Sequence, residues 1–182
     1  MISEGKGQIT PSPIRIKLTP RELGETMAFA RRIADRRGYT YENCLIGYLG
    51  EAALSKYIEQ KLNIQHLANF RELETNGDGG IDIEAYSCAI QVKTHRSGGR
   101  CLISTVKDKR LRPFGNCDYF VFGEVVFMDS GLVSLLGCIS KANLMEHGRF
   151  ENPYLCIDTK DLDPIDRLVT WVESLKLAPE IR

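Results

Sequence analysis

The sequence predicts one α/β domain in which helices flank a mixed central β-sheet. Three observations predict this fold class: two stretches with apolar residues at helical spacing between residues 20 and 61, short alternating or apolar stretches between 81 and 139, and a helical stretch near the end of the chain. A chain of 182 residues has the length of one compact domain. We expect residues 14–182 to form it, after a flexible N-terminal arm at 1–13.

Local signals place each element along the chain. Thr19 is the expected N-cap of the first helix, with Pro20 in its first turn, Glu22 completing a capping box and Gly38 ending it. The other expected elements follow from periodicity and turn residues. They are a strand at 14–18, a helix at 42–61, strands at 68–72, 81–84, 89–94 and 101–106, a hairpin of 119–127 with 132–139, a helix at 141–147, a strand at 154–157 and a final helix that starts at 163–164.

Composition excludes several classes of protein. The chain is 43% hydrophobic and 26% charged, which is ordinary for a globular domain and unlike an intrinsically disordered one. It has neither an apolar run of about 18 residues nor a signal-peptide core, so we expect no membrane partner. The six cysteines show no CxxC spacing, which argues against a zinc site, and a chain of this length does not need a disulfide framework. We therefore expect a reducing, intracellular compartment, the cytoplasm.

Charge is unevenly distributed although the total is zero. Residues 41–90 carry 3 basic and 8 acidic side chains, whereas residues 91–112 carry 7 basic and 1 acidic, a net charge of +6. A basic segment directly after an acidic one is typical of a phosphate-contacting surface beside a carboxylate cluster. A solvated basic loop is the alternative.

The segments GDGGIDIE (77–84) and AIQVK (89–93) contain the candidate chemistry. If they form a hairpin with its loop at 85–88, Glu84 faces Ala89 and Asp82 faces Gln91. Alternation along the strand then places Lys93 on the face of Gln91. This register gathers a carboxylate, an amide and an ammonium on one face. The apolar residues that point the other way, into a core, are Ile81, Ile83, Ile90 and Val92.

Such a set suits a hard divalent cation. Magnesium prefers carboxylate, amide or carbonyl oxygens and retains water. A nearby lysine can orient a water nucleophile or stabilise charge that develops on a phosphate.

GDGGIDI followed by IQVK resembles the active-site signature of the PD-(D/E)xK nucleases, in the variant of Mrr-type restriction endonucleases that has glutamine at the second acidic position. Glu51, in Gly50-Glu51-Ala52-Ala53, matches the helix glutamate that precedes this signature in the family. The resemblance covers about residues 47–94 and implies a restriction-endonuclease-like fold. It also implies Mg²⁺, which Mn²⁺ can replace, and DNA products with 5′-phosphate and 3′-hydroxyl ends.

The resemblance also implies a role for each matching residue. Asp82 would be the central metal ligand, with Gln91 and the Val92 carbonyl completing the shell. Lys93 would position the attacking water, and Glu51 would bind a metal water or a second metal. Each position has a plainer interpretation: a helix-surface glutamate, a turn-capping aspartate, an edge-strand glutamine and a solvated lysine.

We expect the basic residues that follow Lys93 to contact the DNA backbone. His95 is a further phosphate contact or a surface histidine. The backbone-tracking candidates are Arg96, Arg100, Lys107, Lys109, Arg110 and Arg112.

The leading hypothesis is a metal-dependent DNA endonuclease that hydrolyses phosphodiester bonds with a metal-activated water, in restriction, junction resolution, repair or mobile-element processing. A homodimer is expected if both strands are cut. One alternative is a non-catalytic DNA-binding module on a degenerate nuclease fold. Another is a small enzyme that uses GDGG as a nucleotide-phosphate loop, although the spacing matches neither established glycine-rich motif.

Overall fold

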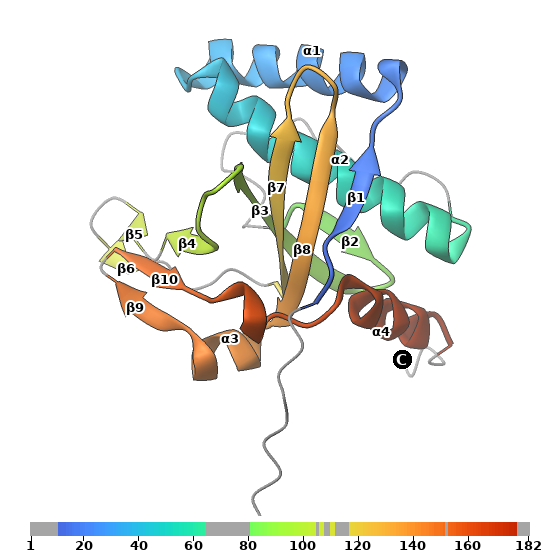
Figure 1. Cartoon of the computed structure of the whole chain (residues 1–182), viewed down its shortest axis with the longest axis vertical. Helices are drawn as coiled ribbons and strands as arrows, with labels where there is room; N and C mark the ends of the chain where they lie inside the picture. The colour runs from blue at the N-terminus through green and yellow to red at the C-terminus, as the bar shows by residue number, and fades with distance from the viewer. Residues whose placement is uncertain are drawn as a thin grey trace, which may run out of the picture.

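A mixed β-sheet forms the centre of the molecule. In the computed structural model, residues 11–64, 81–104, 106–107, 110–111, 117–151 and 153–177 are described. Within them the central sheet has five strands in the order β1-β8-β7-β3-β2 (Figure 1). β3 runs parallel to β7, and the other neighbours are antiparallel. The strand bounds are β1 Ile14–Lys17, β2 Ile83–Ala85, β3 Cys88–Arg96, β7 Tyr119–Phe127 and β8 Leu132–Ser140.

Two smaller sheets lie beside the central one. β10 pairs with both β4 and β9, and β5 pairs with β6. Their bounds are β4 Leu102–Ser104, β5 Val106–Lys107, β6 Arg110–Leu111, β9 Arg149–Glu151 and β10 Tyr154–Cys156. The helices are α1 Pro20–Arg37, α2 Tyr41–Leu62, α3 Lys141–His147 and α4 Ile165–Leu177, with a 3-10 turn, η1, at Thr159–Asp161.

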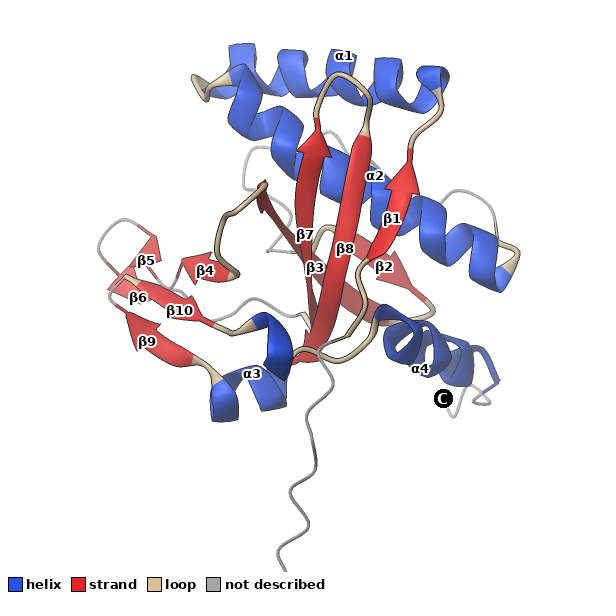
Figure 2. Cartoon of the chain, in the orientation of Figure 1, coloured by secondary structure: helices blue, strands red, loops and turns tan. Residues whose placement is uncertain are grey.

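The helices flank the sheet, as expected. Figure 2 shows α2 crossing behind the strands of the sheet. α1 lies across the upper end of the sheet, and α3 and α4 lie at its lower end. The mixed sheet with flanking helices confirms the predicted fold class in this general form. Among the described residues, no helix is long and apolar enough to span a membrane.

The first helix follows its capping signals. The Thr19 hydroxyl accepts a hydrogen bond from the Glu22 N–H at 3.2 Å, and the Glu22 carboxylate accepts one from the Thr19 N–H at 2.6 Å. Gly38 closes the helix in the left-handed conformation, with φ of 68°. The predicted capping box and C-terminal glycine are confirmed.

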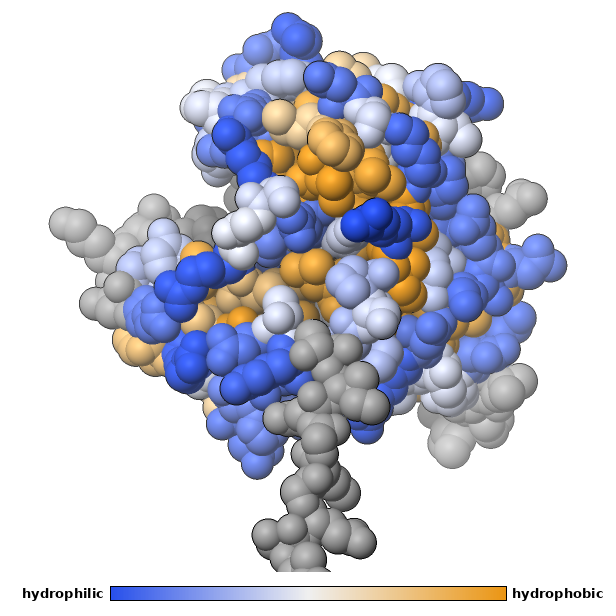
Figure 3. Space-filling view, in the orientation of Figure 1, coloured by the Kyte–Doolittle hydropathy of each residue, from blue (hydrophilic) through white to orange (hydrophobic). Residues whose placement is uncertain are grey.

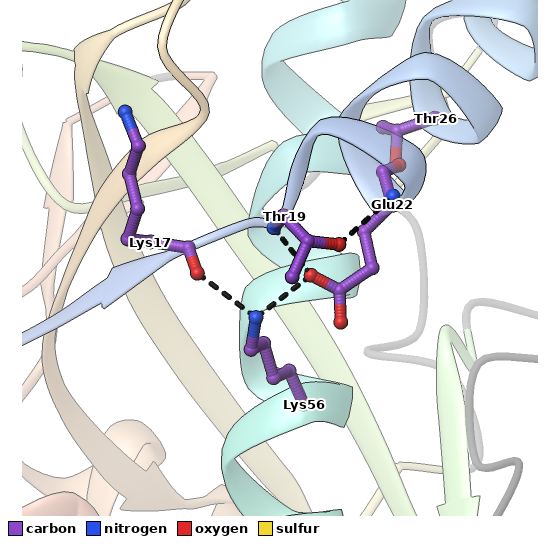
Figure 4. A network of polar contacts seen from close by, with 5 residues as sticks. All are labelled: Lys17, Thr19, Glu22, Thr26 and Lys56. Atoms are coloured by element: carbon purple, nitrogen blue, oxygen red, sulfur yellow. Dashed lines mark hydrogen bonds and ion pairs between the residues drawn. The ribbon is translucent and has the colours of Figure 1, made fainter.

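One lysine ties this helix start to its neighbours (Figure 4). The Lys56 ammonium, on α2, donates to the Lys17 carbonyl at 2.9 Å and to the Glu22 carboxylate at 2.7 Å. Burial would raise the pKa of Glu22, but hydrogen bonds from Lys56 and Thr19 hold it below its usual value. β1, α1 and α2 are thereby joined at one charged contact.

The two faces of the sheet carry separate cores. One core contains Ile90, Val92 and Val121 and is covered by α2 and α4. The other contains Phe120 and Phe122, on the opposite face of β7, and is covered by α3 and the small β4-β10-β9 sheet. The space-filling view shows hydrophobic residues at the surface below α1, bordered by hydrophilic ones (Figure 3).

Most predicted elements are present, with shifted ends. The expected strand at 89–94 extends to Arg96, because β3 pairs with β7 as far as Arg96 opposite Val125. The expected strand at 101–106 is divided between β4 and β5. β9 was not predicted, since all three of its residues are exposed and show no alternation. The expected strand at 68–72 lies outside the described residues.

Candidate functional site

The β2–β3 hairpin has the expected register from Ile83 to Ala85, but its turn is shorter than the expected loop at 85–88. Asp82 precedes β2 and is not paired with Gln91 as a strand partner. Glu84 pairs with Ala89, and Ala85 pairs with Cys88. The turn consists of Tyr86 and Ser87, both at positive φ (47° and 68°). Two consecutive residues at positive φ are typical of the type I′ turn, whose twist matches a two-residue hairpin. The two-residue turn sets the register of β2 and β3 although neither of its positive-φ residues is a glycine.

Alternation along β3 separates the apolar and polar side chains. Ile90 and Val92 are buried in the core beneath α2. Gln91 and Lys93 are half-buried on the other face of β3, where their strand partners on β7 are Phe120 and Phe122. The expected polar face of this strand is therefore present.

Asp82 lies at the edge of β3, just before β2 begins. Its N–H donates to the Ile90 carbonyl at 3.0 Å, and its Oδ2 accepts from the Val92 N–H at 2.7 Å. The N–H and C=O of one residue in a strand point to the same side, so the Val92 carbonyl is turned toward the same edge. The structure thus brings together the Asp82 carboxylate and the Val92 backbone, next to Gln91 and Lys93.

Glu51 lies beside the contact between α2 and β3. A Cβ added to Gly50 would lie 2.9 Å from Thr94 Cβ, so the α2 backbone touches β3 one residue beyond Lys93. Glu51 follows Gly50 and is half-buried. Since α2 covers the face of Val92, the helix of Glu51 lies on that face of β3 and Lys93 lies on the other. A site that uses both must therefore lie at the edge occupied by Asp82.

The donor set at this edge fits a hard cation through oxygen atoms. It offers a carboxylate and a backbone carbonyl, and Gln91, on the adjacent face of β3, carries a side-chain amide oxygen. Within the described residues no group of three His, Cys, Asp or Glu side chains is placed to hold a metal. A cation bound here would keep several water ligands. Asp78, in the glycine-rich turn, lies outside the described residues.

Two of the predicted DNA-contacting arginines form ion pairs. Arg96 pairs with Glu42 of α2, and Arg100 pairs with Glu151 of β9 at 2.9 Å. All four side chains stay largely exposed, between 43% and 58%. Exposed pairs of this kind are weak, so a phosphate can compete for either guanidinium.

The remaining predicted contacts are placed as follows. His95 Nδ1 lies 2.7 Å from the Arg96 carbonyl, and His95 Nε2 is buried without a hydrogen-bond partner. Lys107 and Arg110 are paired across β5 and β6, and their side chains are outside the described part of the structure. Lys109 and Arg112 also lie outside it.

A cavity that the sequence did not predict lies near this site. It has a volume of about 400 Å³, and its lining includes Cys117, Tyr119, Lys141 and Trp171. Burial raises the pKa of the Cys117 thiol, while the positive charges of Lys141 and Lys93 act to lower it. Both ammonium groups are therefore close enough to Cys117 for their charge to be felt there. The lining comes from three distant segments, and no local pattern joins them.

Comparison with known proteins gives one partial similarity. The chain is 26% identical over 123 residues to a protein named DNA-directed RNA polymerase subunit beta from Clostridium novyi (strain NT). The alignment covers 67% of this chain and 8% of that protein, so the chain spans a small part of its relative's length. No family model and no solved structure matches the chain.

Proposed function

We propose that this chain is a Mg²⁺-dependent DNA endonuclease of the restriction-endonuclease-like fold. The observation that carries the proposal is the Asp82 carboxylate, held by the Val92 N–H at the edge of β3. Gln91 and Lys93 follow on β3 in the order that the Mrr-type nuclease signature requires. The mixed sheet with flanking helices is compatible with that fold.

Each residue has a separate task in this proposal. A bound divalent cation would lower the pKa of a water and neutralise charge on the scissile phosphate. Asp82 and the Val92 carbonyl hold the cation, and Gln91 contributes or orients an oxygen ligand. The Lys93 ammonium orients the attacking water and stabilises the negative charge that develops on the phosphate. Glu51 binds a water at the edge from the side of α2.

A non-catalytic DNA-binding module is the second candidate. The observation that favours it is the small number of carboxylates: Gln91 stands where most of these nucleases have an acid, and no three-ligand acidic group is found among the described residues. Such a module would bind DNA through the basic segment at 91–112 and leave it intact.

Cleavage of plasmid DNA in Mg²⁺ or Mn²⁺ distinguishes the two candidates. The informative variants are Asp82→Asn and Lys93→Met, with Glu84→Gln as the matched control because Glu84 is an exposed carboxylate on the same hairpin. We expect both site variants to lose cleavage by at least about 100-fold and the control to retain it. Wild-type binding to DNA without cleavage in either metal would establish the second candidate instead.

A further inference from the structure

The 400 Å³ cavity is broadly open to solvent, and its volume lies in the range of small-molecule sites. It lies where β7 begins and β8 ends, and Figure 1 shows α3 and α4 on the two sides of that end of the sheet. Asp118 and Tyr119 come from the start of β7, Lys141 from the start of α3 and Trp171 from α4. The cavity is thus a place where an aromatic wall, a carboxylate and a lysine meet.

The aromatic wall is made by Tyr119 and Trp171. Their ring centroids are 4.9 Å apart with an interplanar angle of 48°, and both side chains are half-buried against the core beneath α4. Burial raises the pKa of the Tyr119 phenol, so the wall remains uncharged at neutral pH. A planar aromatic ligand can pack on such a surface, and stacking of a nucleobase on an aromatic side chain contributes substantially to single-strand binding.

The polar lining is fixed by backbone hydrogen bonds. Asp118 Oδ2 accepts from the Ala89 N–H at 2.9 Å, and the Lys141 N–H donates to the Asp118 carbonyl at 2.9 Å. These bonds join the starts of β3, β7 and α3. A carboxylate has about four acceptor positions, so the bond to Ala89 leaves capacity for a ligand.

We propose that this cavity binds one unstacked guanine nucleotide of the DNA substrate. The base packs against Trp171 and Tyr119, its adjacent N–H donors bond to the Asp118 carboxylate, and its phosphate pairs with the Lys141 ammonium. A carboxylate matches guanine because guanine presents N–H donors on its Watson–Crick edge, whereas thymine presents carbonyl acceptors on both sides of one N–H.

The cavity is close to the candidate cleavage site. Asp118 exchanges hydrogen bonds with Ala89, which lies two residues before Gln91 on β3. A base held here would fix the position of the adjoining backbone relative to Asp82 and Lys93. This inference rests on the proposed function for the identity of the polymer, and the base pocket itself can be measured without cleavage.

Trp171 reports directly on the cavity because it is the chain's one tryptophan. The experiment titrates full-length protein with dGMP, dTMP and deoxyguanosine in EDTA and follows tryptophan fluorescence. We expect saturable quenching by dGMP, with binding of dTMP and of deoxyguanosine at least about tenfold weaker. Asp118→Asn should weaken dGMP binding about tenfold. Glu173→Gln removes an exposed carboxylate of α4, the helix that carries Trp171, and should leave dGMP binding unchanged.

Two results would overturn the inference: wild-type fluorescence that does not saturate with dGMP, or equal affinities for dGMP and dTMP. Neither result depends on whether Asp118→Asn folds. Asp82→Asn separates the two proposals. If the Asp82→Asn protein no longer cleaves DNA and its Trp171 fluorescence does not respond to dGMP, only the base pocket is wrong. If it binds dGMP but cleaves DNA like the wild type, only the catalytic assignment is wrong.

Discussion

A methyl group added at Gly50 tests how closely α2 is packed on β3. In Gly50→Ala the new Cβ would overlap the Thr94 hydroxyl oxygen, and it would lie 2.9 Å from Thr94 Cβ and 3.2 Å from Thr94 Cγ2. These atoms belong to a β-branched side chain on an inner strand, so they cannot move aside as the end of a long side chain can. Overpacking costs about 1–3 kcal/mol, whereas alanine gains about 1 kcal/mol over glycine inside a helix. We expect a net loss of up to about 2 kcal/mol in the free energy of unfolding.

Gly47 provides the matched control on the same helix. A Cβ added there meets no atom within 4 Å, so Gly47→Ala should gain about 1 kcal/mol. The two variants should therefore differ by about 1–3 kcal/mol, which is about 2–12 °C in melting temperature for a chain of this size. Urea and thermal unfolding followed by circular dichroism measure this difference. A Gly50→Ala protein as stable as Gly47→Ala would refute the close packing of α2 on β3, and with it the position of Glu51.

Two further predictions concern titratable groups. Burial would raise the pKa of Glu22, but hydrogen bonds such as that from Lys56 hold it below its ordinary value of 4.5. A lowered carboxylate pKa stabilises the folded state at neutral pH, and this stability is lost as the pH falls through the folded-state pKa. Glu22→Gln should be less stable than the wild type by under about 1 kcal/mol at pH 7, because solvent screens the partly exposed pair. In urea unfolding, this difference in the free energy of unfolding should disappear below about pH 4.5. A difference that does not change with pH would contradict this. Burial raises the pKa of Cys88 and of Cys138 to about 12. A thiol reagent at neutral pH should therefore modify half-buried Cys44 before either of them, which mass spectrometry can measure. Equal modification rates at the three cysteines would contradict the buried positions of Cys88 and Cys138.

The sequence predicted best what short-range chemistry decides. The capping box at Thr19 and Glu22 and the terminating Gly38 act within one helix turn, and the structure contains all three. The β2–β3 register was predictable because a one-residue shift would have turned Ile90 out of the core. Local periodicity therefore accounts for the position of the candidate site on its hairpin.

The unpredicted features depend on contacts between distant segments. The parallel pairing of β3 with β7 joins strands separated by a long connection, and no local signal marks it. The same holds for the ion pairs of Arg96 and Arg100, whose partners lie on α2 and β9. The cavity beside Trp171 combines residues from β7, α3 and α4, so only the folded chain could reveal it.

Binding of Mn²⁺ tests the central claim most directly, because it examines the edge of β3 without requiring DNA or cleavage. Electron paramagnetic resonance of Mn²⁺ titrated into the full-length protein separates free from bound ion. We predict that Mn²⁺ binds the wild type saturably and binds Glu84→Gln equally well. Binding to Asp82→Asn should be at least about tenfold weaker, because a charged oxygen ligand is lost. Equal binding by Asp82→Asn and wild type would show that the carboxylate beside Val92 holds no metal and would contradict the proposed site.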